Sequence, residues 1–285
     1  VINENQGGDI ASGIDNGTPI STSNGGVQDI RLADLDGDGD SDVITSSRGD
    51  GAVSWYENTG SDGSFGEEKI ISSNVEQASG VAVVDINGDG KLDVLSASSA
   101  DDKIAWYAND GAGNFGEQHI ISTDGLGPQD VHAADVDSDG DSDVVTASFY
   151  DDTIAWYEND GSGNFGTRNI ISTNLAGPKA VTTADINGNG KPDVIATGKM
   201  NGRTAWFANN GGGNFGAAQV VATDSTNHLV DYLEAADLDG DGDMDLFLGH
   251  EGDLAWFENT DGNGTFGPAQ PIHGPSGTSP PEGAA

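Results

Sequence analysis

The stretch DLDGDGDSD at residues 34–42 places an oxygen-bearing side chain at every second position and a glycine at position six. Positions one, three, five and nine are carboxylates, and position seven can add its backbone carbonyl. Hard cations such as Ca²⁺ are bound by flexible sets of oxygen ligands, whereas transition metals favour imidazole or thiolate. Glycine permits the sharp turn that wraps these oxygens around one ion. The stretch therefore predicts a Ca²⁺-binding loop.

The loop recurs four more times, at residues 85–93, 135–143, 185–193 and 237–245, so that metal chemistry and chain repeat together. We expect about five Ca²⁺, one for each loop. The candidate ligands at positions one, three, five, seven and nine are Asp34, Asp36, Asp38, Asp40 and Asp42; Asp85, Asn87, Asp89, Lys91 and Asp93; Asp135, Asp137, Asp139, Asp141 and Asp143; Asp185, Asn187, Asn189, Lys191 and Asp193; and Asp237, Asp239, Asp241, Asp243 and Asp245, with position seven acting through its carbonyl.

The five loops differ in charge at the four side-chain positions. The first, third and fifth loops carry four carboxylates each, and the second carries three because Asn87 is neutral. The fourth carries two, since Asn187 and Asn189 replace acids. Fewer charged ligands give weaker Ca²⁺ binding, so the loop at 185–193 is expected to empty first. An EF-hand is not indicated, because Thr45 stands where its glutamate would be and no helical pattern follows.

The composition restricts the partners of this 285-residue chain. Its formal net charge is −38, from 48 acidic and 10 basic residues, and five bound Ca²⁺ would not neutralise it. Phosphate repulsion excludes nucleic acid as a favourable partner. No apolar run is long enough to span a membrane, so no membrane insertion is expected. The chain has no cysteine, and bound metal must supply any cross-linking.

Aromatic residues repeat with the loops. A tryptophan followed by a second aromatic recurs once per unit, and a Phe-Gly pair follows each of them. The pairs begin at Trp55, Trp106, Trp156, Trp206 and Trp256, and the Phe-Gly pairs begin at Phe65, Phe115, Phe165, Phe215 and Phe266. A period near 50 residues is typical of propeller blades and solenoid units. Packing between units is the expected role of the tryptophans, with a glycan pocket near them as the alternative.

Each unit reads as four short strands joined by Asn, Asp and Gly turns. In the third unit the strand-like stretches are 130–134, 143–148, 153–158 and 168–172, and no window shows helical spacing. Four antiparallel strands repeated radially describe a blade of a β-propeller. The predicted fold is therefore an all-β propeller with five full repeats; a β-helix is the main competitor, although its rungs are usually shorter.

The loop pattern together with Phe-Gly resembles the FG-GAP/VCBS repeat family over roughly residues 27–273. That family includes Ca²⁺-binding propellers of integrin α-subunit heads, lectins and many secreted surface proteins. The resemblance implies that the aspartate at position nine carries the last ligand. It also implies a carbohydrate or protein ligand at the cell surface, and an extracellular or surface location. The Gly-Ala-Pro half of the integrin signature is missing and the units are shorter, so no particular partner follows.

The ends of the chain depart from the repeat. Residues 3–7 and 19–24 resemble the turn and the last strand of a unit, so residues 1–26 are interpreted as a partial repeat, an outer hairpin without inner strands or metal loop. Residues 274–285 lack a strand pattern and are expected to be a flexible tail or linker. We favour five full blades plus the hairpin. A sixth blade built from the hairpin, or one piece of a larger assembly, are the alternatives, and the hairpin could also mediate self-association.

No catalytic site emerges from the sequence. The five histidines share no repeat position, and His228, Tyr232 and His250 are the only candidates for a lyase-like site. The tripeptide at 48–50, Arg-Gly-Asp, sits at a turn that is acidic in other units, and we interpret it as a chance match. The functional hypothesis is a Ca²⁺-stabilised binding module, with carbohydrate as the leading ligand. A self-assembling surface subunit and a propeller polysaccharide lyase are the alternatives.

Overall fold

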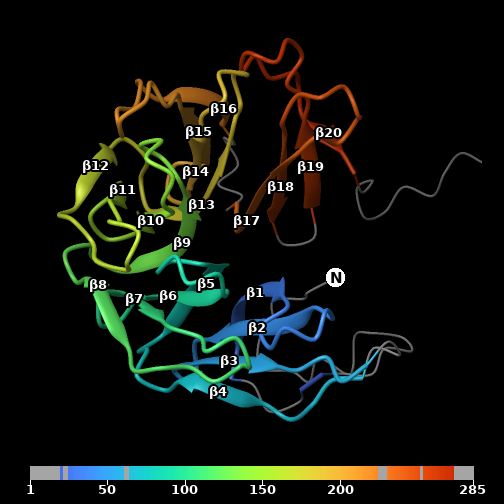
Figure 1. The fold of residues 1–285 in the computed structure, drawn as a ribbon. Helices are drawn as coiled ribbons and strands as arrows, with labels where there is room; N and C mark the ends of the chain where they lie inside the picture. Colours follow the sequence, from blue (N-terminus) through green and yellow to red (C-terminus); the bar gives the residue numbers. More distant parts are fainter. Residues whose placement is uncertain (1–19, 22–24, 61–63, 224–229, 251–252, 273–285) are drawn as a thin grey trace, which may run out of the picture.

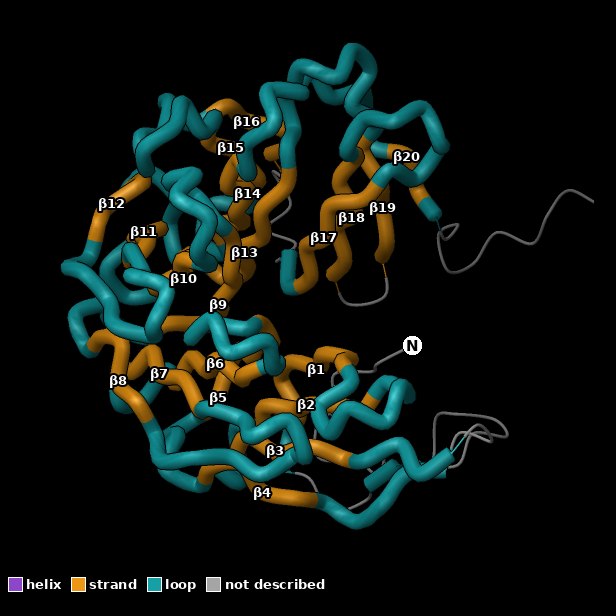
Figure 2. The backbone as a smooth tube through the Cα atoms, in the orientation of Figure 1, coloured by secondary structure: helices purple, strands orange, loops and turns teal. Residues whose placement is uncertain are grey.

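A computed structural model of the chain describes residues 20–21, 25–60, 64–223, 230–250 and 253–272. The described strands form five antiparallel sheets of four strands each, arranged around a common axis (Figures 1 and 2), and the described residues contain no helix. No described helix could therefore cross a membrane. The predicted all-β propeller of five four-stranded blades is confirmed. Most of the predicted partial repeat at 1–26, and the predicted tail at 274–285, lie outside the described residues.

The strands follow the repeat in chain order. Blade one contains β1 (Val27–Ala33), β2 (Asp42–Ser47), β3 (Ala52–Tyr56) and β4 (Lys69–Ser72), and blade two contains β5 (Ala78–Val84), β6 (Asp93–Ser98), β7 (Lys103–Tyr107) and β8 (His119–Ser122). Blade three contains β9 (Pro128–Ala134), β10 (Asp143–Ser148), β11 (Thr153–Tyr157) and β12 (Asn169–Ser172), and blade four contains β13 (Pro178–Ala184), β14 (Asp193–Gly198), β15 (Arg203–Phe207) and β16 (Gln219–Thr223). Blade five contains β17 (Tyr232–Ala236), β18 (Asp245–His250), β19 (Asp253–Phe257) and β20 (Gln270–Pro271). The four strands expected in the third unit are all present.

The two aromatic residues on each third strand pack in opposite directions because successive side chains of a strand alternate between the faces of the sheet. Trp106 of β7 lies in a cluster with Val144 and Tyr157 of blade three. Its neighbour Tyr107 lies in the cluster with Trp55 of blade one. The core is therefore a series of inter-blade layers, each bringing a tryptophan of one blade to an aromatic residue of the next. This confirms packing as the role of the first four tryptophans, which are all buried.

A glycine of the following blade covers each of these tryptophans. Gly113, Gly163, Gly213 and Gly264 lie over Trp55, Trp106, Trp156 and Trp206, and each has a positive φ. A Cβ atom added to Gly213 would lie only 2.1 Å from the Trp156 ring. Both the backbone conformation and the close approach therefore require glycine at this turn.

An asparagine side chain fastens each blade to the metal loop of the preceding blade. The Asn109 Nδ2 donates to the Leu35 carbonyl at 2.8 Å, and Asn159, Asn209 and Asn259 repeat this bond to Ile86, Val136 and Ile186. All four asparagines are buried. A buried carbonyl without a donor costs about 1–3 kcal/mol. These four asparagine bonds therefore stabilise the contact between neighbouring blades.

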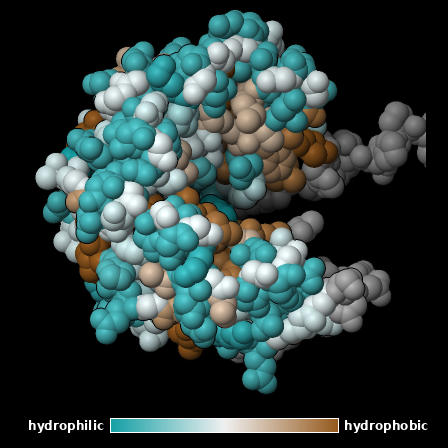
Figure 3. All heavy atoms as spheres, in the orientation of Figure 1, coloured by the Kyte–Doolittle hydropathy of each residue, from teal (hydrophilic) through white to brown (hydrophobic). Residues whose placement is uncertain are grey.

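In the part of the chain that the structure describes, the ring has an opening between blade five and blade one. Inner strands pack on their neighbours from β1 through β5, β9 and β13 to β17, but β17 does not pack onto β1 in the same way. The two strands approach only at the axis, where both line a small channel pocket. Their outer strands diverge (Figure 1), and the space-filling view shows a notch between the two blades (Figure 3).

The glycine over Trp156 gives a test of this packing. Replacing Gly213 by alanine forces a Cβ into the indole and strains a positive φ, so the variant is expected to lose about 2–4 kcal/mol of unfolding free energy. Gly216→Ala is the matched control, because its Cβ would meet Ala208 at an ordinary 3.5 Å. Equal denaturation midpoints for the two variants in urea would contradict this description of the interface.

Candidate metal loops and central channel

The aspartate at position nine of each loop is the first residue of the second strand and is fully buried in all five blades. Both of its oxygens accept backbone N–H groups within the blade. In blade three, the Asp143 Oδ2 accepts from Val136 at 3.1 Å and its Oδ1 from Asn159 at 2.9 Å. Asp42, Asp93, Asp193 and Asp245 make the same two bonds. This carboxyl therefore ties the start of the loop to the end of the third strand.

Burial makes ionisation of four of these carboxyls, those of Asp42, Asp93, Asp143 and Asp193, less favourable. It raises the pKa of Asp143 to about 7 and that of Asp193 to about 6, although the backbone N–H bonds act in the opposite direction. Nearby Asp137 and Asp139 raise the pKa of Asp143 further by like-charge repulsion. Burial also raises the pKa of Asp42 and Asp93. A cation among these oxygens would remove both causes.

The remaining acidic residues are held by backbone N–H groups of their own loop. In loop three, the Asp135 Oδ2 accepts from Gly140 at 3.1 Å, and the Asp137 Oδ1 accepts from Asp139 at 3.1 Å. Position five accepts in turn from position seven, as the Asp139 Oδ1 does from Asp141 at 3.0 Å. The glycine at position six has a positive φ in every loop. The sequence thus folds locally into a turn that aims its carboxylates inward.

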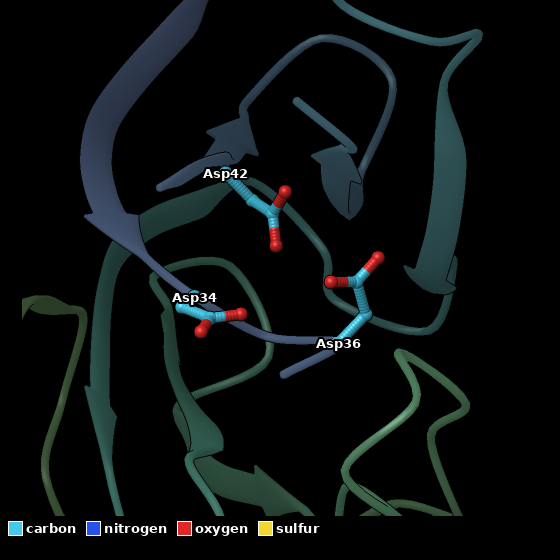
Figure 4. Close-up of side chains that lie close together, drawn as sticks. All are labelled: Asp34, Asp36 and Asp42. Atoms are coloured by element: carbon cyan, nitrogen blue, oxygen red, sulfur yellow. The ribbon is translucent and has the colours of Figure 1, made fainter. Parts of the chain in front are cut away.

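Three loops bring positions one, three and nine into one cluster. The clusters are Asp34, Asp36 and Asp42; Asp135, Asp137 and Asp143; and Asp237, Asp239 and Asp245, with one oxygen of each residue within 4.8 Å of the others. Figure 4 shows the first cluster, drawn from the end of β1, the loop and the start of β2. These are the three loops that the sequence gives four carboxylates. Carboxylate oxygens this close repel one another without a cation, so the residues present fit Ca²⁺.

The fourth loop is held differently. The Asn187 Nδ2 donates to the Asp193 Oδ1 at 3.2 Å, and the Asn189 Nδ2 donates to the Asn209 carbonyl at 3.1 Å. Amide donors thus occupy positions that are carboxylates in the first, third and fifth loops. This loop therefore needs a cation less than the three acidic clusters do, and its weak Ca²⁺ binding stays a prediction.

Position five is not part of the three acidic clusters, and position seven points away from the loop. Asp141 and Lys191 lie against Gly161 and Gly211, in the turn between the third and fourth strands of their own blades. The position-seven side chain therefore packs on the outer turn of its own blade, and its carbonyl stays a predicted ligand. Whether position five completes the coordination remains a prediction.

A second cluster of charged groups lines the central channel, and the sequence analysis missed it. The Asp29 Oδ2 of β1 accepts from the Val81 N–H of β5 at 3.0 Å, and the Asp130 Oδ2 of β9 accepts from the Val181 N–H of β13 at 2.9 Å. Arg31 forms an ion pair with Asp29. These positions differ between units, so the repeat gives no signal for them.

Burial and the nearby Asp29 raise the pKa of Asp130 to about 7, although Arg31 opposes the shift. Burial and the Arg31 charge lower the pKa of His132 to about 4, so this histidine is neutral at pH 7. Of the lyase candidates, Tyr232 lines the channel pocket, while His228 and the side chain of His250 lie outside the described residues.

The Arg-Gly-Asp turn is engaged by its own chain. Arg48 donates to the Gln77 Oε1 at 2.8 Å, and the Asp50 Oδ2 accepts from the Gly25 N–H at 2.6 Å. Both charged ends of the tripeptide therefore have structural partners, which agrees with its interpretation as a chance match.

Comparison with known proteins supports the architecture. A lectin from Agrocybe aegerita, described for recognition of non-reducing terminal N-acetylglucosamine, has a TM-score of 0.60 and 24% identity, over 85% of this chain and 65% of the lectin. The chain thus spans less than two thirds of that lectin. Virginiamycin B lyase from Staphylococcus aureus has a TM-score of 0.58 and 11% identity, over 89% of this chain and 71% of the lyase. At these identities the likeness shows the fold alone.

No curated protein sequence matches the chain significantly. The FG-GAP-like repeat, in contrast, matches it five times in succession, over residues 34–96, 85–146, 135–196, 190–248 and 237–284. Each match begins at or close to a metal loop, so the family pattern and the blades of the structure share one period. The chain belongs to the FG-GAP-like repeat family.

Proposed function

We propose that this chain is a calcium-stabilised propeller that binds carbohydrate outside the cell. Calcium binding is proposed because the same acidic cluster, formed by positions one, three and nine of the loop, recurs in three blades around a buried aspartate. Structural acids on a protein surface would have no reason to converge in this way three times. Oxygen ligands without histidine or cysteine favour Ca²⁺ over a transition metal.

Bound Ca²⁺ would supply the positive charge that each loop lacks. Positions one, three and nine would hold the ion, with the carbonyl of position seven and the side chain of position five as further ligands. The ion would be fixed at an inter-blade joint, because each of the first four loops accepts an asparagine bond from the next blade. Its role is structural, and it requires the millimolar Ca²⁺ of an extracellular setting.

Two surface features support carbohydrate as the ligand. The turn between β2 and β3 and the segment before β5 form an open groove of about 610 Å³, lined by polar residues that include Arg48, Asn74 and Gln77. On the corresponding turn of blade three, Tyr150 is 67% exposed and one side of its ring lies against Gly127. An aromatic ring that is packed on one side and exposed on the other is suited to stack on a sugar. The lectin fold of the Agrocybe aegerita protein is consistent with this proposal.

The unequal loops give a calcium prediction. Asn187→Asp places a third carboxylate beside Asp185 and Asp193 and removes the amide donor, so the fourth loop should bind Ca²⁺ about tenfold more tightly, or about 1.4 kcal/mol. Asp137→Asn makes the reverse change in loop three and should weaken that site by a similar factor. Isothermal titration calorimetry of chelator-treated protein measures both.

The reciprocal design controls for a general effect of charge. If Asn187→Asp left the weakest site unchanged, or if Asp137→Asn raised the thermal midpoint in millimolar Ca²⁺, the loops would not be Ca²⁺ sites of the proposed kind.

A glycan array tests the ligand. Tyr150→Ala should weaken binding several-fold by removing the stacking ring, whereas Tyr150→Phe should keep it because the ring is retained. Met200, which is exposed on the equivalent turn of blade four, provides the control substitution Met200→Ala, expected to bind normally. Silence of the wild-type protein across the array, with and without Ca²⁺, would discard carbohydrate as the ligand.

A further inference from the structure

The face of blade five that borders the opening of the ring has the composition of an inter-blade interface, but no described blade packs on it. We call it the terminal face and define it by Tyr232, Leu238, Phe247, Leu254 and Trp256. Leu238 is 46% exposed, whereas its counterparts in the other four loops are at most 1% exposed. Leu254 is 36% exposed, while the equivalent Ile154 is fully buried. Apolar surface borders the notch on the blade-five side in Figure 3.

The terminal face also lacks the two contacts that complete every other interface. Each earlier loop offers its position-two carbonyl to an asparagine of the next blade, but no described asparagine donates to the Leu238 carbonyl. Each earlier tryptophan lies beneath a glycine, but no described glycine covers Trp256, which is only half-buried. An occupant must therefore bring an asparagine amide, a glycine turn and an apolar strand.

The chain before blade one is tethered at this opening. The Arg48 N–H donates to the Gly26 carbonyl at 3.0 Å, in the same way as the Ser99 N–H donates to the Gln77 carbonyl at 3.1 Å. In blades two to four, the segment that reaches this point comes directly from the last strand of the preceding blade. By the same path, residues before Gly25 would come from the last strand of a blade situated in the opening.

The sequence of residues 1–24 carries the features that the terminal face requires. Residues 3–7, Asn-Glu-Asn-Gln-Gly, align with Tyr157-Glu-Asn-Asp-Gly161, which places Asn5 at the position of Asn159. Ile20 and Ser21 align with Ile121 and Ser122 at the end of blade two. Ile2 then takes the place of the tryptophan on the third strand, and Gly7 and Gly8 fall in the stretch of sequence that aligns with the glycine-rich turn.

We propose that residues 1–24 dock on the terminal face as the outer hairpin of an incomplete sixth blade, with the Asn5 amide donating to the Leu238 carbonyl. This inference does not depend on the proposed ligand. An intramolecular occupant has a high effective concentration because it is tethered at Gly25. A second copy would have to overcome repulsion between two chains of formal charge −38. It would also have to enter an opening that narrows to the channel, where β1 and β17 line one pocket.

Cross-linking in this cysteine-free chain tests the proposal. In the double variant Asn5→Cys with Leu238→Cys, a short bismaleimide should give a cross-linked monomer at millimolar Ca²⁺. The matched control is Asn5→Cys with Ile120→Cys, since Ile120 is similarly exposed, at 48%, but lies in blade two. Cross-linked monomer several-fold above this control, resolved by size-exclusion chromatography, is the expected result. Monomer at the control level, or cross-linked dimer alone, would overturn the proposal.

A second readout does not depend on cross-linking chemistry. Trp256 should become more accessible to acrylamide when residues 1–19 are deleted, measured as the difference in quenching between each protein and its Trp256→Phe variant. Thermal unfolding in Ca²⁺ confirms that the truncated protein is folded. Unchanged quenching of Trp256 in a folded truncated protein would contradict docking on this face, and increased quenching would support it.

Discussion

The stability of the whole ring depends on how the charge of one buried carboxyl group in each blade is compensated. The aspartate at position nine starts the second strand, accepts two backbone N–H bonds and is removed from solvent, so a nearby cation would stabilise its charge. A proton on this carboxyl would leave the other acidic side chains of the loop crowded together. A divalent ion would offset both the burial of this carboxyl and the repulsion between its neighbours.

The metal loops are also linked in series. The asparagine that donates its backbone N–H to the position-nine aspartate sends its side chain to the loop of the preceding blade. Asn159 thus connects the second and third loops, and Asn109 connects the first and second. A structural change in one loop can therefore affect the next inter-blade interface. This coupling gives the chain, which has no disulfide and an excess of acid, a substitute for covalent cross-links.

The repeat allowed most of the fold to be predicted from the sequence. Loops, tryptophans and Phe-Gly pairs recur with one period, so the blade count and the packing role of Trp55 through Trp206 could be read directly. The channel cluster of Asp29, Arg31 and Asp130 could not, because these positions differ between units and meet only when blades surround an axis. The hydrogen bond from the Asn187 amide to Asp193 in the fourth loop could not be predicted either. The sequence gives the charge of a loop but not the direction in which a side chain points. The opening of the ring could not be predicted either, because the repeat does not give the number of blades that a closed ring needs.

A crystal structure grown in millimolar Ca²⁺, with anomalous data collected at long wavelength, tests the central claim most directly. The account predicts anomalous peaks within the first, third and fifth loops, each contacting the position-nine aspartate, and the weakest peak in the fourth loop. Absence of any peak from the three acidic clusters, with the loops still ordered at neutral pH, would show that something other than a bound cation stabilises these buried carboxyls.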